Sequence, residues 1–352
     1  MIKNISGIQQ IGIGVSDVNN AWKWYRKNFG MDIPIFQESA EAALMTRYTG
    51  GVVHSRSAVL AMNLQGGAGM EIWQFTSRKS EQQNFEIQLG DYGIFCSKIK
   101  CIDVRKTFEQ FKKDGLNILG NINNSPDGTE HFFVKDPFGN THQIIKADDW
   151  YTNGNRLTGG ICGCVIGVSD IEKSLKLYSD VLEYDKIIYD KTSIFPDFAA
   201  LPSGTKKMRR ILLQRTKKQT GNFSDLLGAG SIELVQVSDI QPKKIFENRF
   251  WGDLGFIHLC FDVQEMNDLK KSCEAAGFPF TVDSSNAFDM GEASGHFSYV
   301  EDPDGTLIEF VEAYKIPIFK KIGWYLNLKK RNPLKPLPKW MLRALALNRV
   351  RD

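Results

Sequence analysis

Four segments of the chain begin with a short apolar run that alternates with small or polar residues, the pattern of a β-strand. They span residues 8–17, 94–102, 161–170 and 256–263. The first and third runs end in a Ser-Asp pair, at Asp17 and Asp170, and both residue types are favoured helix N-caps. We therefore predict that these strands lead directly into helices.

Apolar residues after each of these strands recur at the three-and-four spacing of an amphipathic helix. The predicted buried faces are Ala21, Trp22, Tyr25 and Phe29; Val104, Phe108 and Phe111; Leu175, Tyr178, Val181 and Leu182; and Met266, Leu269 and Cys273. Gly115 and Gly277 are placed to end the second and fourth helices, because glycine readily adopts the left-handed conformation that follows a helix.

Further strand-like runs follow each helix, including residues 70–75 and 232–237, which come after a Gly-Ala-Gly sequence. Each unit thus consists of a strand, a helix and about three more strands, and the chain contains four such units. Residues 148–158 are polar and turn-prone and form the natural joint between two halves. Because one unit cannot bury both faces of its sheet, two units are expected to pair and to enclose a concave surface.

The clearest internal repeat is a strand, turn and strand that occurs at residues 297–310 and again at residues 132–144. Seven residues after the Asp of its Asp-Pro-x-Gly turn, one copy has Glu309 and the other has Gln143. Glu309 lies between Ile308 and Phe310, and burying an unpaired carboxylate costs several kcal/mol. We expect Glu309 to face a metal ion.

The composition is that of a globular protein large enough for two domains: 352 residues, 42% hydrophobic and 24% charged. The start of the sequence lacks the pattern of a secretory signal, and no apolar run approaches the roughly 18 residues of a membrane span. Six cysteines occur without CxxC pairs and are interpreted as buried, reduced thiols. We expect a cytoplasmic monomer or homodimer with no integral membrane segment.

Basic residues concentrate at the C-terminal end, although the formal net charge of +3 is too small to indicate nucleic acid binding. Residues 315–352 contain eleven bases and a single acid, Asp352. Trp340, Met341, Ala344 and Leu345 lie among these bases at helical spacing, so this tail can be interpreted as a helix that binds a membrane surface or a partner. The interpretation that we favour is that the tail packs over its own domains with its bases solvated.

The four repeated units, the Asp-Pro-Asp-Gly turn and the acid seven residues after its Asp make residues 8–313 resemble the vicinal oxygen chelate superfamily. This superfamily includes glyoxalase I, methylmalonyl-CoA epimerase, extradiol dioxygenases and the fosfomycin and bleomycin resistance proteins. The resemblance implies an α+β fold in which four βαβββ units form two glyoxalase-like domains with cup-shaped mixed sheets. The domains would span residues 1–149 and 156–314, followed by the basic tail at 315–352. The cup would hold a divalent metal ion (Zn, Ni, Mn, Co or Fe) that takes two adjacent oxygens of a small-molecule substrate.

The resemblance also implies which positions carry metal ligands, on the first and the last strand of each unit. The first-strand positions are Gln10, Cys96, Gly163 and His258, and the last-strand positions are Glu71, Gln143, Glu233 and Glu309. An imidazole and carboxylates hold a divalent ion, whereas glycine offers no side-chain donor and an amide is a weak one. His258 and Glu309 are therefore the strongest candidates.

Two pairings of the units give two ligand sets. If unit one pairs with unit four across the halves, the set is Gln10, Glu71, His258 and Glu309, which is the ligand set of glyoxalase I. If units three and four pair within their own half, the set is Glu233, His258 and Glu309, with a gap at Gly163. We favour the crossed set because it leaves no position vacant. Its second cup would contain Cys96, Gln143, Gly163 and Glu233, too few ionisable donors to retain a metal.

One imidazole with two carboxylates favours an isomerase or lyase of the glyoxalase type that acts through an enediolate. Glu309 would be both ligand and base, with Glu71 (or Glu233) as its acid–base partner. Glyoxalase I has a glutathione-binding arginine four residues after its first-strand glutamine, but Gly14 stands at that place here. A glutathione adduct is therefore not indicated as the substrate.

Two other functions remain open at this point. An extradiol Fe(II) dioxygenase requires a second histidine ligand. His54, His131, His142 and His296 are not at first-strand ligand positions, although a one-residue slip in the last strand would turn His142 inward in place of Gln143. The third function is non-catalytic binding of a small molecule, as in the resistance proteins, with the strand aromatics stacking on a planar ligand.

Overall fold

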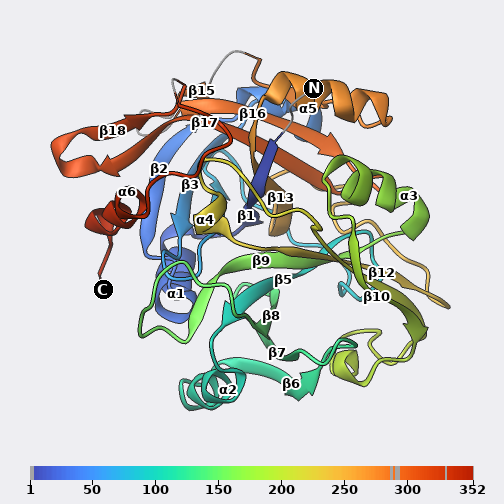
Figure 1. Cartoon of the computed structure of the whole chain (residues 1–352). Helices are drawn as coiled ribbons and strands as arrows, with labels where there is room; N and C mark the ends of the chain where they lie inside the picture. Colours follow the sequence, from blue (N-terminus) through green and yellow to red (C-terminus); the bar gives the residue numbers. More distant parts are fainter. Residues whose placement is uncertain (1–3, 286–287, 290–293, 330, 352) are drawn as a thin grey trace.

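The structure is a computed structural model that describes residues 4–285, 288–289, 294–329 and 331–351. The chain forms two curved mixed sheets with helices packed against them, which confirms the predicted α+β class (Figure 1). The first sheet has ten strands and the order β14-β16-β17-β13-β1-β4-β3-β2, with β15 paired to β16 and β18 paired to β17. The second sheet has eight strands in the order β10-β11-β12-β9-β5-β8-β7-β6.

Each quarter of the chain supplies one unit of strand, helix and further strands. Unit one comprises β1 (Asn4–Gly14), α1 (Val18–Phe29), β2 (Ile33–Glu41), η1 (Ala43–Tyr48), β3 (Ser55–Met62) and β4 (Gly69–Phe75). Unit two comprises β5 (Gly93–Cys101), α2 (Val104–Lys113), β6 (Asn117–Asn124), β7 (Glu130–Lys135) and β8 (Thr141–Lys146). Unit three comprises β9 (Thr158–Gly167), α3 (Ile171–Leu175), η2 (Lys176–Val181), β10 (Lys186–Ser193), η3 (Pro196–Phe198), β11 (Met208–Gln214), α4 (Ser224–Leu227) and β12 (Ser231–Val237). Unit four comprises β13 (Gly255–Gln264), α5 (Met266–Ala275), β14 (Val282–Asp283), β15 (Phe288–Asp289), β16 (Ser294–Glu301) and β17 (Leu307–Phe319).

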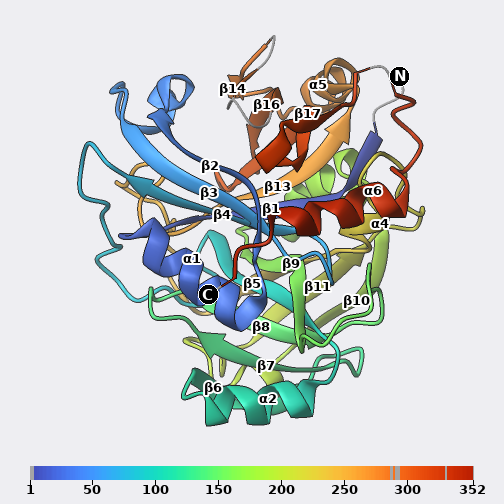
Figure 2. The same cartoon turned by 90° about the vertical axis from the view of Figure 1, so that its left-hand side faces the viewer.

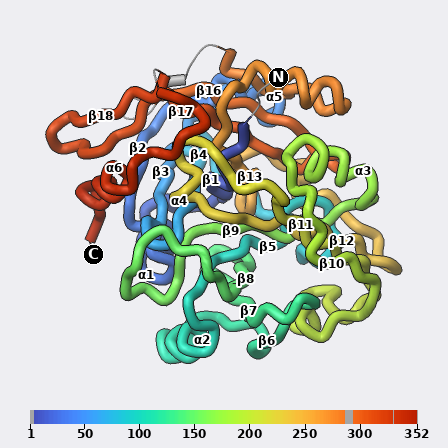
Figure 3. The backbone as a smooth tube through the Cα atoms, in the orientation of Figure 1, coloured from blue at the N-terminus to red at the C-terminus, as the bar shows by residue number. Residues whose placement is uncertain are grey.

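The units pair across the two halves of the chain. Strand β1 lies antiparallel to β13, so unit one shares its sheet with unit four, and β5 lies antiparallel to β9, so unit two shares its sheet with unit three. Figure 3 shows the blue start of the chain beside the orange strand β13. The boundaries at residues 1–149 and 156–314 remain a prediction, because each sheet takes strands from both segments.

The four predicted helix ends are found, one in each unit. Asp17 and Asp170 cap α1 and α3 by accepting hydrogen bonds from backbone N–H groups, as predicted. Gly115 and Gly277 follow α2 and α5 with φ values of 72° and 89°, which favour glycine. The helix of unit three differs from the prediction. After Leu175 it continues as a π-helix, in which the N–H of Leu182 bonds the carbonyl of Leu177 at 2.9 Å.

Two tyrosines tie the helices to the repeated turns. Tyr25 of α1 donates to Asp136 Oδ2 at 2.5 Å, and Tyr178 of η2 donates to Asp302 Oδ2 at 2.9 Å. Each tyrosine lies eight residues after the aspartate that caps its helix, and each partner is the first aspartate of an Asp-Pro-x-Gly turn in the same half of the chain. The two halves therefore share this buried contact as well as their order of elements.

A large core lies between the two sheets, and smaller apolar clusters fill the concave side of each sheet. Helix α1 packs against β3 and β4 of the first sheet and β9 of the second, and it lies between the sheets in Figure 2. Ile11 and Ile13 of β1 face this core, so Gln10 and Gly12, which alternate with them, face the opposite side.

The described part of the basic tail packs on the first sheet. Strand β17 continues to Phe319 and turns through η4 (Lys320–Ile322) into β18 (Trp324–Asn327), which pairs with it. The chain then reaches α6 (Lys339–Arg343) and η5 (Ala344–Asn348), which contacts β17 and β2. Its buried leucines are Leu328, Leu337, Leu342 and Leu345. Within the described ranges, none of the helices has both the length and the apolar character needed to cross a membrane.

Candidate metal centre

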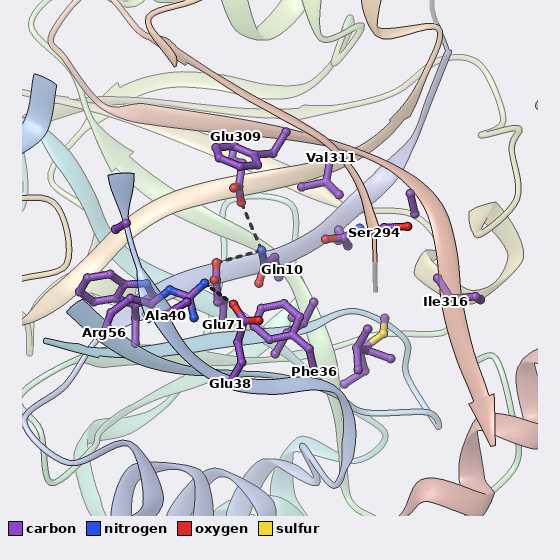
Figure 4. Close-up of a pocket in the computed structure, with 18 of the residues that line it drawn as sticks. Gln10, Phe36, Glu38, Ala40, Arg56, Glu71, Ser294, Glu309, Val311 and Ile316 are labelled. Carbon is purple, nitrogen blue, oxygen red and sulfur yellow. Dashed lines mark hydrogen bonds and ion pairs between the residues drawn. The ribbon is translucent and has the colours of Figure 1, made fainter. Parts of the chain in front are cut away.

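Four polar side chains meet on the concave face of the first sheet. Gln10 lies on β1, Glu71 on β4, His258 on β13 and Glu309 on β17, and these four strands are neighbours in the order β17-β13-β1-β4. Each of the four residues is at most 7% exposed. Figure 4 shows Gln10 between Glu309 and Glu71. The structure thus brings together all four residues of the crossed set.

The polar atoms of these residues lie within hydrogen-bond distance of one another, but not all of them have a hydrogen-bond partner. Gln10 Nε2 donates to Glu71 Oε2 at 3.3 Å and to Glu309 Oε2 at 3.2 Å. His258 Nε2 lies 3.4 Å from Glu71 Oε2 and 3.1 Å from Glu309 Oε2. Within the part of the chain that the structure describes, neither His258 Nε2 nor Gln10 Oε1 has a hydrogen bond of acceptable geometry. Buried polar atoms are rarely left in this state unless a ligand or an ion is their partner.

A glycine makes room for the imidazole. Gly12 is the direct neighbour of His258 across the β1–β13 pair and of Glu71 across the β1–β4 pair. A Cβ atom at residue 12 would lie 2.4–2.7 Å from Cε1, Nε2 and Nδ1 of His258, which is far inside contact distance. The ring of His258 therefore occupies the space over β1 that any other residue at position 12 would fill.

The electrostatics of the cluster favour a cation. Burial lowers the pKa of His258, but the carboxylates of Glu309 and Glu71 outweigh it and raise this pKa to about 9. Burial raises the pKa of Glu309, yet the imidazole of His258 outweighs burial and keeps the pKa of Glu309 below its usual value. Two buried carboxylates thus require a positive charge beside them, which either a proton on His258 or a metal ion can supply.

Tyr299 is part of the same cluster, and the sequence analysis did not find it. Its hydroxyl lies 3.3 Å from His258 Nδ1 and its ring packs edge-on against the imidazole. Burial, followed by the charge of Glu309, raises the pKa of Tyr299 well above its usual value, so the phenol stays protonated. If Nδ1 of His258 carries the proton and donates to Tyr299, the lone pair of Nε2 is free for a metal. The repeat could have indicated Tyr299, because the strand, turn and strand that contain Glu309 also contain Tyr299. The two residues lie directly opposite each other in the β16–β17 pair.

The residues fit a divalent metal ion. One ligand atom from each of Glu71, His258 and Glu309 lies within 4.8 Å of the other two, and Gln10 Oε1 is an unpartnered acceptor beside them. Imidazole nitrogen and carboxylate oxygen suit Zn, Mn, Fe, Ni and Co, and the charges of two carboxylates balance a divalent ion. Among the residues that the structure describes, this is the one group of three such side chains close enough to share an ion.

A cavity of about 320 Å³ adjoins the cluster. Gln10, Glu71 and Glu309 contribute to its lining, and most of the remaining lining is apolar or aromatic. The apolar side chains include Phe36, Leu60, Met62, Trp73, Trp251, Phe297, Val311 and Ile316. A small organic molecule can therefore contact the cluster while most of its surface is buried against apolar side chains.

An ion pair on the cavity wall was also missed by the sequence analysis. Arg56 of β3 donates through Nη2 to Glu38 of β2, and both line the cavity (Figure 4). Arg56 is 7% exposed, and its Nη1 has no hydrogen-bond partner among the described residues. This nitrogen is available to a hydrogen-bond acceptor on a bound molecule. Sequence spacing alone gave no signal for it, because the pair forms between two strands whose register was not predicted.

The second cup is closed by an internal ion-pair network. Glu233 of β12 accepts hydrogen bonds from Lys98 Nζ, Arg210 Nε and the Tyr189 hydroxyl, each at 2.7 Å. Burial raises the pKa of Glu233, but Arg210 and Lys98 outweigh it and lower this pKa to about 2. Glu233 lies on the other sheet from His258, so the structure does not bring together the alternative set of Glu233, His258 and Glu309.

The other predicted positions of the second cup also lie in packed surroundings. Cys96 and Gln143 are fully buried, and Gly163 lies close to the backbone of Ser231. The guanidinium of Arg210 lies 3.5 Å from the centre of the Phe198 ring, which belongs to the apolar cluster inside this cup. Side chains therefore fill the inside of the second cup, whereas the inside of the first cup contains the cavity.

His142 faces away from this cup, so the one-residue slip does not occur. Its Nδ1 lies 2.7 Å from the Ser97 hydroxyl and its Nε2 lies 3.1 Å from Asp136 Oδ2, and the ring packs against Phe29 and Phe256 of the main core. In the β5–β8 pair Ser97 lies opposite His142 and Lys98 lies opposite Gln143. Gln143 is therefore the residue that shares a face with the second cup.

Comparison with known proteins agrees with this architecture. Residues 7–144 and 160–310 match the family model described as the Glyoxalase/Bleomycin resistance protein/Dioxygenase superfamily. A candidate dioxygenase from Bacillus subtilis is similar in structure, with a TM-score of 0.59, 13% identity, and coverage of 88% of this chain and 86% of that one. Glyoxalase I from Zea mays gives a TM-score of 0.51 at 15% identity over 88% of this chain and 92% of its own, and a variant of that enzyme gives 0.54 at 14% over the same shares. No curated protein matches the chain by sequence. At these identities the solved structures support the fold and leave the reaction open.

Proposed function

Because the chain belongs to the Glyoxalase/Bleomycin resistance protein/Dioxygenase superfamily, we propose that it is a divalent-metal-dependent isomerase or lyase of the glyoxalase type. Its substrate would be a small molecule with two adjacent oxygen atoms. The observation that carries this proposal is the buried group of Glu71, His258 and Glu309 beside an apolar cavity. All six cysteines are buried, in keeping with reduced thiols in a cytoplasmic protein.

In this proposal the protein holds the ion with His258 Nε2, the carboxylates of Glu71 and Glu309, and the amide oxygen of Gln10. A bound ion would supply Lewis acidity, which polarises a carbonyl oxygen and acidifies the adjacent C–H bond. Tyr299 fixes the tautomer and the orientation of His258 through Nδ1.

The two glutamates are the groups that can move a proton. Glu71 and Glu309 come from strands on opposite sides of the β13–β1 pair, so they approach the centre from two directions. One carboxylate can remove a proton from carbon and become a carboxylic acid. The neighbouring carbon or oxygen can then take a proton, either the same one from that glutamate or one already held by the other glutamate.

The histidine count argues against extradiol ring cleavage, which uses two histidines and one carboxylate. His131 lies 3.3 Å from Asp197, His142 bonds Ser97 and Asp136, and His296 lies 2.6 Å from Asp283. His54 bonds Ser77 at the surface. With all five histidines of the chain among the described residues, His258 alone contributes an imidazole to the cluster.

The cavity favours a largely apolar substrate. Its walls are mainly aromatic and aliphatic, and Arg56 is already paired with Glu38. The unpartnered Nη1 of Arg56 suits one acceptor oxygen at a distance from the reacting carbons. A non-catalytic binding protein would use the same cavity but would not need two buried carboxylates, whose burial is costly.

The test combines metal content with proton exchange. Purified protein is loaded in turn with nickel, zinc, manganese, cobalt or iron(II), and α-hydroxycarbonyl compounds and 2-oxoaldehyde hemithioacetals are incubated with it in D₂O. We expect about one ion per chain, loss of that ion in His258→Ala and Glu309→Gln, and metal-dependent incorporation of deuterium at carbon.

Gln143→Met is the matched control, since Gln143 holds the position in the second cup that Glu309 holds in the first. It should retain the ion and the exchange reaction. Equal metal content in all variants would refute the proposed centre. Oxygen consumption with catechols in place of exchange would instead identify a dioxygenase, and metal-independent ligand binding without turnover would identify a binding protein.

A further inference from the structure

Exposed apolar side chains are concentrated in one short part of the chain. Of the twelve large hydrophobic residues that are exposed within the described ranges, six lie between residues 322 and 347. They are Ile322, Trp324, Tyr325, Leu334, Trp340 and Leu347. Ile322 at the β17–β18 turn is 70% exposed and Trp340 of α6 is 61% exposed. Isolated exposed hydrophobic residues are common, but a cluster of this kind marks an interaction surface.

Two of the six residues, one from the hairpin and one from α6, contact each other. The rings of Trp324 on β18 and Trp340 on α6 are stacked, with centroids 6.5 Å apart. Figure 1 shows the β17–β18 hairpin projecting from the body of the molecule, with α6 close to it. We call the exposed side chains of residues 321–347 the hairpin–α6 surface.

This surface is strongly basic, whereas the rest of the chain is acidic. The tail from residue 315 holds eleven of the 44 bases and one of the 41 acids. That leaves 33 bases against 40 acids in the first 314 residues, a net charge of −7, while the tail carries +10. Its exposed bases include Lys321, Lys329, Arg331, Lys335, Lys339 and Arg343. The small charge of the whole protein therefore hides a positive surface on a negative body.

The α6 part of this surface is attached to the body of the protein by hydrogen bonds and buried leucines. Leu337 N–H donates to the Asn222 carbonyl at 2.9 Å, and the Tyr151 hydroxyl donates to the Lys339 carbonyl at 2.9 Å. Leu342 and Leu345 are buried beneath α6 and η5. The tail packs on the first sheet through its buried leucines. Trp340 and the basic side chains are not needed for this packing and remain exposed to solvent.

We propose that the hairpin–α6 surface docks the protein on an anionic lipid bilayer. Trp and Tyr favour the headgroup region, Ile322 and the exposed leucines can enter the acyl boundary, and the lysines and arginines attract anionic headgroups. Exposed aliphatic side chains beside the bases distinguish this surface from one suited to a nucleic acid backbone, which offers no apolar layer. The charge difference between tail and body orients the molecule with this surface toward the membrane.

Docking would bring one wall of the apolar cavity close to the bilayer. Lys315 and Ile316 of β17 and Leu345 of η5 line that cavity, and they belong to the same segment as the hairpin–α6 surface. An apolar molecule could then pass from the lipid phase into the cavity along a short route. The docking itself does not depend on the metal chemistry proposed for the cavity.

The test is flotation of the full-length protein with vesicles of phosphatidylcholine alone or phosphatidylcholine mixed with phosphatidylserine. We expect binding to the mixed vesicles that high salt weakens, since each base near an anionic surface contributes roughly fivefold to partitioning. The triple variant Lys321→Gln, Lys335→Gln, Lys339→Gln should lower it on the order of a hundredfold. Trp340→Ser should lower it several-fold and leave the salt dependence in place.

The control is a triple variant with the same loss of charge on α2, Lys106→Gln, Lys112→Gln and Lys113→Gln, because α2 packs on the second sheet, at the bottom of the molecule in Figure 1 and away from the hairpin and α6. It should bind like the natural protein. The proposal fails if the protein ignores both vesicle types, if binding does not depend on phosphatidylserine, or if the α2 variant loses as much binding as the tail variant. It also fails if the natural protein forms a dimer that Trp340→Ser dissociates, since the surface would then be covered by a second copy of the chain.

Discussion

Gly12 and His258 lie directly opposite each other on β1 and β13, and the imidazole fills the space that a side chain at residue 12 would need. We predict that Gly12→Ala displaces the ring and weakens metal binding by roughly 10–100-fold. Calorimetric titration of the metal-free protein would measure this change.

A double variant separates displacement from general damage. Overpacking by the new methyl group should also destabilise the metal-free protein by about 1–3 kcal/mol. Removing the ring with His258→Ala makes room for that methyl group, so the double variant should be more stable than Gly12→Ala while still failing to bind metal. Full metal affinity in Gly12→Ala would show that His258 is not a ligand.

Tyr299 is expected to act on the centre through His258. Its hydroxyl lies 3.3 Å from Nδ1, and Tyr299→Phe removes that partner without changing the ring that packs against the imidazole. Loss of such a contact to a ligand lowers metal affinity by roughly 10–100-fold. Competition with a chelator would measure the loss, and Tyr48→Phe, which changes a tyrosine hydroxyl that bonds Glu301 and Thr281, is the control. Unchanged affinity in Tyr299→Phe would leave the tautomer of His258 to be fixed by another group.

The candidate ligand positions came from the resemblance to the superfamily, and the repeat together with strand alternation placed them on their strands without any knowledge of how the strands pair. Gln10, Glu71, His258 and Glu309 could be placed on their strands one at a time, and only the pairing of the units was open. The register of β1 with β13 decides that pairing, and it depends on the packing of whole units.

The network in the second cup could not be predicted for the same reason. Lys98 lies in a Ser-Lys-Ile-Lys sequence whose lysines would ordinarily face solvent on an alternating strand. It is buried because Glu233, 135 residues away in the sequence, lies 2.7 Å from its ammonium group. Nothing in the local pattern indicates a partner at that distance along the chain.

Lys98 is therefore expected to matter for folding and not for metal binding. Lys98→Met leaves Glu233 buried with one cation fewer, and breaking a buried pair in this way costs about 3 kcal/mol. Changing both residues, in Lys98→Met with Glu233→Gln, should recover part of the loss because no uncompensated charge remains. Urea unfolding measures both effects, and metal content should equal that of the natural protein. A loss of metal in Lys98→Met would mean that the two cups are coupled.

Gln143 is predicted to make the natural protein less stable than a variant with an apolar residue at this position. It is fully buried, and within the described ranges neither its amide nitrogen nor its amide oxygen has a hydrogen-bond partner. Leaving such a group unsatisfied costs about 1–3 kcal/mol, whereas methionine has a similar volume and no polar hydrogen. Gln143→Met should therefore raise the free energy of unfolding by about 1 kcal/mol. A decrease would show that a ligand or water satisfies the amide in solution.

Asp262 should make stability depend on pH. Burial raises its pKa from 3.8 to about 7, although hydrogen bonds from Ser6 and Gln264 oppose the rise, and the nearby charge of Glu312 adds to it. Because this pKa is higher in the folded than in the unfolded protein, the folded state binds more protons between about pH 4 and pH 7. Asp262 then contributes stability at acidic pH that is lost as the pH rises through about 7. Asp262→Asn removes the ionisable group, so its free energy of unfolding should rise relative to that of the natural protein by about 3 kcal/mol between pH 5 and pH 8. Urea unfolding of both proteins across this range would measure the difference. Parallel pH profiles would mean that water reaches Asp262 and that its pKa is close to the ordinary value.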